Sequence, residues 1–173
     1  SNLRTAKLIG NLGECHLHGS LFKHAEAAIR QSLEIQISLL GKEHPSIAES
    51  LNNLSVSLNE QGRVSEAEEL QREAIALLEK QPEAQPIELA QMVGGLASIL
   101  TSQAKFEAAE EFHQRALTMK LRLLPKDHPS VAISQNNLAL VLCERGKFAR
   151  AEKLFREVLA VRQKILGKEH PDV

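Results

Sequence analysis

The stretch LGKEHP at residues 40–45 recurs along this chain at fixed distances. The same six letters stand at residues 166–171, and the related LPKDHP stands at residues 124–129. The related copy lies 84 residues after the first, and the last copy lies 126 residues after it. Both distances are multiples of 42. A fixed period of this length indicates a repeat architecture, in which each unit is one supersecondary element.

Two further motifs follow the same period. Leucine recurs at Leu12, Leu54, Leu96 and Leu138, and an alanine followed by glutamate recurs at Ala25, Ala67, Ala109 and Ala151. We therefore expect four repeats at about 1–40, 41–82, 83–124 and 125–166, with a truncated fifth from residue 167. Residues 1–173 are expected to form a single array, which is a fragment of a longer protein or one that associates end to end.

Each repeat is predicted to contain two helices. In the second repeat, apolar residues at Ile47, Leu51, Leu54 and Leu58 lie on one helical face. Gly62 ends that helix, and a second, longer apolar helix runs on to about Lys80. The first repeat has Ser20 and the third has Ala104 in place of Gly62. The first repeat is therefore either a terminal repeat or one with a locally shifted turn.

The GKEHP motif is predicted to join one helix pair to the next. Gly41 can adopt the left-handed conformation that terminates a helix. His44 precedes a proline and is pushed out of the α region, while Pro45 fits the first turn of the following helix. The histidines of this motif are interpreted as turn residues. The joint at 81–88 lacks the histidine and shifts the proline by one position, which predicts a different turn there.

Composition excludes several classes of protein. The net charge is −1, with 21 basic and 22 acidic residues interspersed, whereas nucleic-acid binders carry a basic excess. No apolar run approaches the roughly 20 residues of a membrane span. The chain has two cysteines and no signal-peptide pattern at its start, which favours a reducing, cytoplasmic compartment.

The helix pairs, Gly62, Ala67 and Ala74 resemble the tetratricopeptide repeat (TPR). The 42-residue period, the NNLA at 136–139 and the GKEHP joints are similar to its kinesin-light-chain subclass. The resemblance implies an all-α fold, a right-handed α-solenoid of stacked antiparallel helix pairs. It also implies a concave groove, lined by the first helix of each pair, that binds an extended peptide or a segment of a protein partner.

The register predicts which side chains face that groove. Asn11, Asn53 and Asn137 occupy the same position in successive repeats, with Gly95 as the exception. They are interpreted either as a ladder that grips a peptide backbone or as side chains that bond neighbouring helices and hold the repeats in register. The full set of expected partner-binding residues is Lys7, Asn11, Glu14, Glu49, Asn52, Asn53, Val56, Asn59, Gln91, Gly95, Ser98, Asn136, Asn137, Leu140 and Glu144.

The charges of this set indicate the kind of partner. Some relatives bind chaperone tails through a carboxylate clamp. Lys7, Asn11 and Asn53 match its first three positions, but Gln91 and Gly95 stand at the last two. The groove leans acidic, so a neutral or mildly basic segment is expected. Gly94 and Gly95 either open space for a bulky partner side chain or reflect close backbone packing.

No enzyme, cofactor or metal site is expected. Cys15, His16 and His18 do not converge from one helical face, and Cys143 has no histidine partner in the sequence pattern. No phosphate-binding loop or nucleophile elbow is present. The alternative to a peptide-binding scaffold is a purely architectural array that associates with itself through its open ends.

Overall fold

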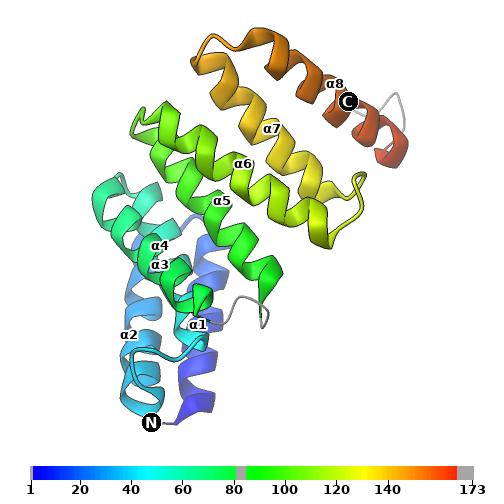
Figure 1. The fold of residues 1–173 in the computed structure, drawn as a ribbon. Coiled ribbons are helices and arrows are strands. Elements are labelled where there is room, and N and C mark those ends of the chain that lie inside the picture. The colour runs from blue at the N-terminus through cyan, green and yellow to red at the C-terminus, as the bar shows by residue number, and fades with distance from the viewer. Residues whose placement is uncertain (1, 81–84, 167–173) are drawn as a thin grey trace. The chain divides into compact units, whose positions relative to one another are not determined.

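The computed structural model describes residues 2–80 and 85–166, and within them every regular element is an α-helix (Figure 1). This confirms the all-α helical repeat fold. The helices are α1 (Leu3–His18), α2 (Phe22–Leu40), α3 (Ser46–Glu60), α4 (Val64–Glu79), α5 (Pro86–Ser102), α6 (Phe106–Leu123), α7 (Pro129–Glu144) and α8 (Phe148–Leu166). The fifth repeat, expected from residue 167, lies outside the described residues.

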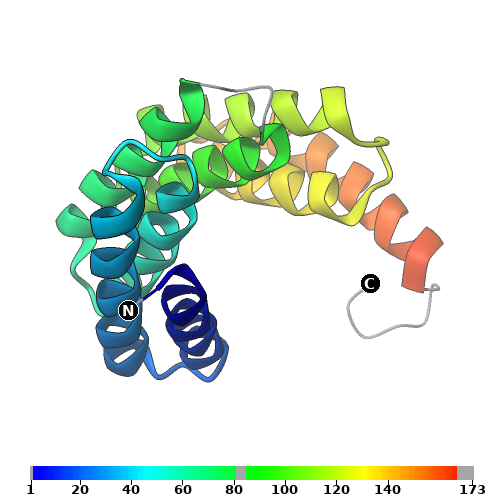
Figure 2. The same cartoon turned by 90° about the horizontal axis from the view of Figure 1, so that it is seen from below.

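The chain divides into two compact units, Ser1–Gln85 and Pro86–Val173. In the first unit, α1 packs on α2, α2 on α3 and α3 on α4. In the second unit, α5 packs on α6, α6 on α7 and α7 on α8. Within each unit the helices run antiparallel to their chain neighbours, as Figures 1 and 2 both show. The first helix of each pair therefore lies beside the second helices of its own pair and, in α3 and α7, of the preceding pair.

The turns inside the four pairs share one backbone conformation at 42-residue intervals. The central residue has a positive φ in each: 56° at Ser20, 78° at Gly62, 56° at Ala104 and 70° at Gly146. The next residue donates its N–H to the carbonyl oxygen five positions back, at 2.8–2.9 Å in all four turns. The turn of the first repeat is therefore not shifted. Ser20 itself adopts the left-handed conformation that glycine adopts at the equivalent position.

Small residues let the two helices of a pair approach closely. The alanines of the 42-residue motif are all buried: Ala25, Ala67, Ala109 and Ala151. Opposite Ala67, the buried Ser55 donates its hydroxyl to the Ala67 carbonyl oxygen at 2.7 Å. In α1 the same position is Gly13, where an added Cβ would lie 2.6 Å from Cγ1 of Ile29. Larger side chains at these positions would push the helices apart.

The joints between pairs confirm the predicted glycine and proline positions. Gly41 has φ of 83°, α3 begins directly after Pro45, and α7 begins at Pro129. The histidines do more than turn the chain. Nδ1 of His128 accepts the N–H of Ser130 at 3.1 Å, so His128 caps α7. His44 accepts the N–H of Ser46 in the same way, at 3.2 Å. The joint at 81–88 lies partly outside the described residues.

In the first pair of each unit, the glutamate that follows the motif alanine ties that pair to the next. Glu26 of α2 accepts from Arg63 in the following pair's turn at 2.8 Å. In the second unit, Glu110 of α6 accepts from Lys147 at 2.7 Å and from Arg150 at 2.9 Å, and it also pairs with Arg145. Burial alone would raise the pKa of Glu110, but the hydrogen bonds from these three cations outweigh it and leave the pKa lowered.

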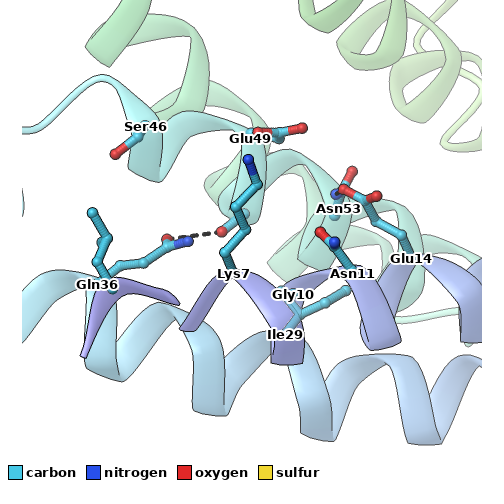
Figure 3. A pocket seen from close by; sticks show the side chains of 11 residues that line it. Lys7, Gly10, Asn11, Glu14, Ile29, Gln36, Ser46, Glu49 and Asn53 are labelled. Carbon is cyan, nitrogen blue, oxygen red and sulfur yellow. Dashed lines mark hydrogen bonds between the residues drawn. The ribbon is translucent and has the colours of Figure 1, made fainter. Parts of the chain in front are cut away.

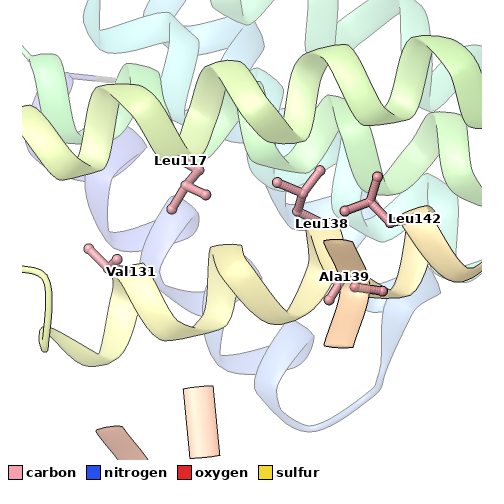
Figure 4. Packing of buried hydrophobic residues seen from close by; sticks show 6 residues of the cluster. Leu117, Val131, Leu138, Ala139 and Leu142 are labelled. Carbon is pink, nitrogen blue, oxygen red and sulfur yellow. The ribbon is translucent and has the colours of Figure 1, made fainter. Parts of the chain in front are cut away.

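The second unit has an apolar cluster between α6, α7 and α8. Leu138 and Leu142 point from α7 toward α6, where Leu117 meets them, and Ala139 packs on the other side of α7 (Figure 4). Val131 and Ala151 complete its buried members. Leu138 is therefore buried by the preceding repeat, as the register predicts.

The register does not by itself predict burial in α1. Leu12 occupies the position of Leu54 and Leu138, yet it is 50% exposed, whereas each of those two leucines is 1% exposed. Leu8 is exposed as well. The preceding second helix buries Leu54 and Leu138, and no described helix precedes α1. A leucine at this register position is therefore buried only where a described second helix packs against it.

The turn of the third repeat predicts a stabilising substitution. Ala104→Gly relieves the left-handed conformation of an L-residue and should raise the free energy of unfolding by about 1 kcal/mol, measured by urea denaturation. Ala108→Gly, inside α6, is the control and should lower it by about 1 kcal/mol. A loss of stability in Ala104→Gly would show that the Ala104 side chain contributes more than its backbone strain costs.

Glu110 predicts a pH-dependent loss of stability. Its pKa is lowered on folding, so its contribution is present above its ordinary value of 4.5 and is lost as the pH falls through the lowered pKa. Glu110→Gln should lower the free energy of unfolding at pH 7 by on the order of 1–3 kcal/mol. The difference from the parent should narrow as the pH falls below 4.5 and close once the pH is below the lowered pKa of Glu110. The exposed Glu111→Gln is the control, and an unchanged difference at low pH would contradict the ion-pair account.

Candidate functional site

The strongest candidate site in the first unit is a cavity of about 340 Å³ between α1, α2 and α3 (Figure 3). Five of the expected partner-binding residues line it: Lys7, Asn11, Glu14, Glu49 and Asn53. The remaining lining residues are Leu3, Gly10, Ile29, Gln36, Ser46 and Ser50. The structure therefore brings these five predicted residues of the first two repeats together at one place, while Asn52, Val56 and Asn59 do not line the cavity.

The walls of this cavity are polar and lean acidic. Figure 3 shows Lys7 pointing from α1 toward the side of the cavity that carries Glu49. Lys7 forms no ion pair among the described residues, while Glu14 and Glu49 add two negative charges to the same walls. The acidic balance expected from the sequence thus holds for the cavity of the first unit.

The first unit uses two of its asparagines to bond its own helices. Asn53 donates its amide to Glu14 at 3.0 Å and so links α3 to the preceding first helix. Asn52 accepts from Nε2 of the buried Gln71 at 2.9 Å and links α3 to α4. Both bonds match the structural interpretation of the asparagines. Asn11, in contrast, is exposed and forms no side-chain hydrogen bond among the described residues.

In the second unit the equivalent asparagines keep their amides available. Asn136 and Asn137 are half-buried, and their side chains form no hydrogen bond within residues 2–80 and 85–166. Asn137 is flanked on one face of α7 by Ile133 and Leu140, which are 56% and 51% exposed. Exposed apolar side chains next to an amide with free donors and acceptors are typical of a binding surface.

Most of the remaining expected residues are exposed on the first helices. Val56 is exposed on α3, and Gln91, Ser98 and Glu144 are exposed on α5 and α7. Gly95 is half-buried. Ser98 donates its hydroxyl to the Gly94 carbonyl oxygen at 3.2 Å, one turn back in its own helix. Asn59 is half-buried, and its Oδ1 is a buried atom that has no hydrogen-bond partner.

Sequence reasoning missed the second-helix side of the cavity. Gln36 of α2 lines it and accepts a hydrogen bond from the Ser50 hydroxyl at 2.9 Å. The signal was present, because the equivalent position 42 residues later is the buried Leu78. A polar residue in the apolar stripe of a second helix marks a place where that helix meets a polar first helix.

The described residues give no support to a metal site or a membrane span. No group of three or more His, Cys, Asp and Glu side chains among them could hold a metal ion. The rings of His16 and His24 lie 5.6 Å apart, but nothing else converges on them. Within the same residues, no helix has the length and apolar character to cross a membrane.

Substitutions of Asn52 and Asn53, which are adjacent on α3, are expected to have different costs. Asn52→Ala removes the acceptor to which the buried Gln71 donates, and should lower the free energy of unfolding by about 1–3 kcal/mol. Asn53→Ala removes a bond at the cavity edge and should cost about 1 kcal/mol or less. Asn136→Ala is the matched control and should change stability by about 0.5 kcal/mol at most. Thermal or urea denaturation measures all three, and equal losses would contradict this ranking.

Tetratricopeptide-repeat family models match the chain at residues 4–80, 89–130 and 131–172. No curated protein matches it. Among solved structures, the repeats of a predicted kinesin light chain from Podosopora anserina match with 24% identity and a TM-score of 0.73, covering 93% of this chain and 76% of that one.

Two further structures show the same fold. BtubC (BKLC) of P. vanneervenii has 19% identity and a TM-score of 0.83, with 96% of this chain and 66% of that chain covered. Aspartyl phosphate phosphatase F of Bacillus subtilis has 16% identity and a TM-score of 0.81, with 95% and 42% covered. The family matches extend over nearly the whole sequence, and the helix pairs follow the same register. This chain therefore belongs to the tetratricopeptide-repeat family, in a form whose repeats resemble those of kinesin light chains.

Proposed function

We propose that this protein binds an extended segment of a protein partner along the exposed faces of its first helices. Tetratricopeptide repeats generally mediate protein–protein interactions, which sets the class of function. The finer proposal concerns where the segment lies. We call the candidate surface the first-helix stripe, and it comprises Lys7, Asn11 and Glu14 on α1, Glu49, Asn53 and Val56 on α3, Gln91, Gly95 and Ser98 on α5, and Asn137, Leu140 and Glu144 on α7.

One observation carries the proposal: the available amide of Asn137 beside the exposed Ile133 and Leu140 on α7. Leaving two large apolar side chains half in water has no benefit for an isolated fold. An amide without an internal partner can donate to and accept from a peptide backbone, whatever the sequence of that peptide. Apolar contacts would supply binding energy and the amide would set the position of the bound segment.

The two units differ in the kind of peptide segment that each would bind. In the first unit, Glu14 and Glu49 flank the cavity, so a neutral or mildly basic stretch fits there. In the second unit, α7 offers mainly apolar contacts through Leu140 and Ile133. Because Asn53 already bonds Glu14, the gripping role rests on Asn11 and Asn137 rather than on all three asparagines.

A peptide-display selection on the folded chain tests this proposal. Enriched peptides should bind Asn137→Ala and Leu140→Ala roughly tenfold more weakly than the parent, measured by fluorescence polarisation. Gln31→Ala and Gln114→Ala, exposed on second helices, are the matched controls and should bind as the parent does. Circular dichroism checks that each variant is folded.

The opposite outcome would favour the second candidate, an architectural array. Leu8 and Leu12 are exposed on α1 at positions where the other first helices pack against a neighbouring helix. Helix α8 of a second copy of this chain can cover them. If no peptide enriches, and light scattering shows association that Leu12→Gln abolishes, the peptide proposal fails. The open ends would then be the functional surface.

A further inference from the structure

The second unit holds a buried cation for which the structure describes no acidic partner. Lys120 of α6 is 7% exposed, and its ammonium donates to the Ser134 hydroxyl at 2.9 Å and to the Ser130 carbonyl oxygen at 3.4 Å. No Asp or Glu among the described residues forms an ion pair with it. A buried charge is normally paired, because neutral oxygens compensate only part of the hydration that it loses.

The 84-residue register shows what this part of the molecule corresponds to. Lys120 occupies the position of Gln36, and Ser130 and Ser134 occupy those of Ser46 and Ser50. The same pair of positions is in contact, although the direction of the hydrogen bond is reversed: Gln36 accepts from Ser50 at 2.9 Å, and Lys120 donates to Ser134 at 2.9 Å. Gln36, Ser46 and Ser50 all line the cavity of the first unit. Lys120 therefore stands where the first unit turns a polar second-helix side chain toward its candidate site.

The facing first helix has lost the groups that would compete for this cation. In the first unit, Lys7, Asn11 and Glu14 of α1 form the opposite wall. Their counterparts on α5 are Gln91, Gly95 and Ser98, which are neutral, and Glu49 on α3 becomes Ile133 on α7. The net charge of the equivalent positions thus changes from acidic in the first unit to basic in the second.

A second donor lies on the same face of α6. His113 is seven residues before Lys120 and 3% exposed, and it forms no hydrogen bond among the described residues. Burial, with a smaller contribution from the charge of Lys120, lowers the pKa of His113 to about 4. The ring is therefore neutral near pH 7 and keeps one N–H donor without a partner.

We propose that Lys120, which contacts Ser134 and lies on the same face of α6 as His113, binds a carboxylate carried by the segment that the protein recognises. This rests on the proposed function and names one anchor of the segment. The site differs from the first-helix stripe, because its charge comes from a second helix, α6. A carboxylate supplies the counter-charge that the cation lacks, and charge-assisted hydrogen bonds are about twice as strong as neutral ones.

Capped peptides with matched acidic and neutral residues test the proposal on the whole chain. The first arm compares acetylated, amidated peptides that carry one Asp or Glu with the same peptides carrying Asn or Gln. The second arm compares neutral peptides that end in a free carboxylate with their amidated forms. The arm that shows the preference identifies the carboxylate as a side chain or a chain end. We expect roughly tenfold to hundredfold tighter binding of one carboxylate form.

Lys120→Gln is the decisive variant, because glutamine occupies the equivalent position in the first unit. It should abolish the carboxylate preference while the neutral peptides still bind. Lys120→Met is a second variant, and Lys126→Gln, on the exposed joint, is the matched control. The His113 ring signals in NMR spectra should shift with the carboxylate peptide and not with its neutral match, which locates the effect at this site.

Two results would overturn the anchor while leaving the proposed function intact. One is equal binding of acidic and neutral peptides that Asn137→Ala still weakens. The other is a carboxylate preference that survives in Lys120→Gln. If no peptide of either kind binds the parent, both the anchor and the proposed function are wrong.

Discussion

The close contact of paired helices at small residues is the constraint on which the other features depend. Ala67 and Ser55 meet at a buried crossing, and Gly13 leaves no room for a side chain beside Ile29. With the helices fixed at this distance, the next residue after each alanine is placed at the edge of the crossing. Glu26 and Glu110 stand there, and both reach a cation in the following turn. The same crossing therefore determines the distance between the two helices of a pair and places the glutamate that binds the next pair.

The sequence predicted the fold because the 42-residue period preserves the backbone conformation of each turn, even where the residue at the turn changes. Ser20 and Ala104 looked like departures from the glycine turn, yet both adopt its conformation and make its hydrogen bond. A left-handed residue costs an L-amino acid about 1–2 kcal/mol, which the packing on both sides of the turn can offset. A missing glycine in one repeat is therefore weak evidence against a turn that the other repeats establish.

Burial and bonding partners were harder to predict, since they depend on which helix lies next to a residue. Leu12 has the same register as Leu54 but lacks the second helix that would cover it. Asn52 and Asn136 also share a register, but only Asn52 has an amide partner, because Gln71 is replaced by Phe155 in the later repeat. The sequence placed the candidate residues correctly on the first helices. It could not separate the asparagines that bond the protein from those that remain available.

A contrast between fixed and variable positions explains how one scaffold can present a neutral junction in one unit and a charged junction in the other. The crossing residues and the turns tolerate little change, since they determine the distance and direction of the helices. The residues between them, at the junction of a second helix with the next first helix, can change charge without disturbing either. Gln36 accepts a hydrogen bond from Ser50, and Lys120 donates one to Ser134 at the equivalent position, so the contact is kept while the charge changes. A junction that keeps its geometry while its charge varies is where a helical repeat can acquire specificity.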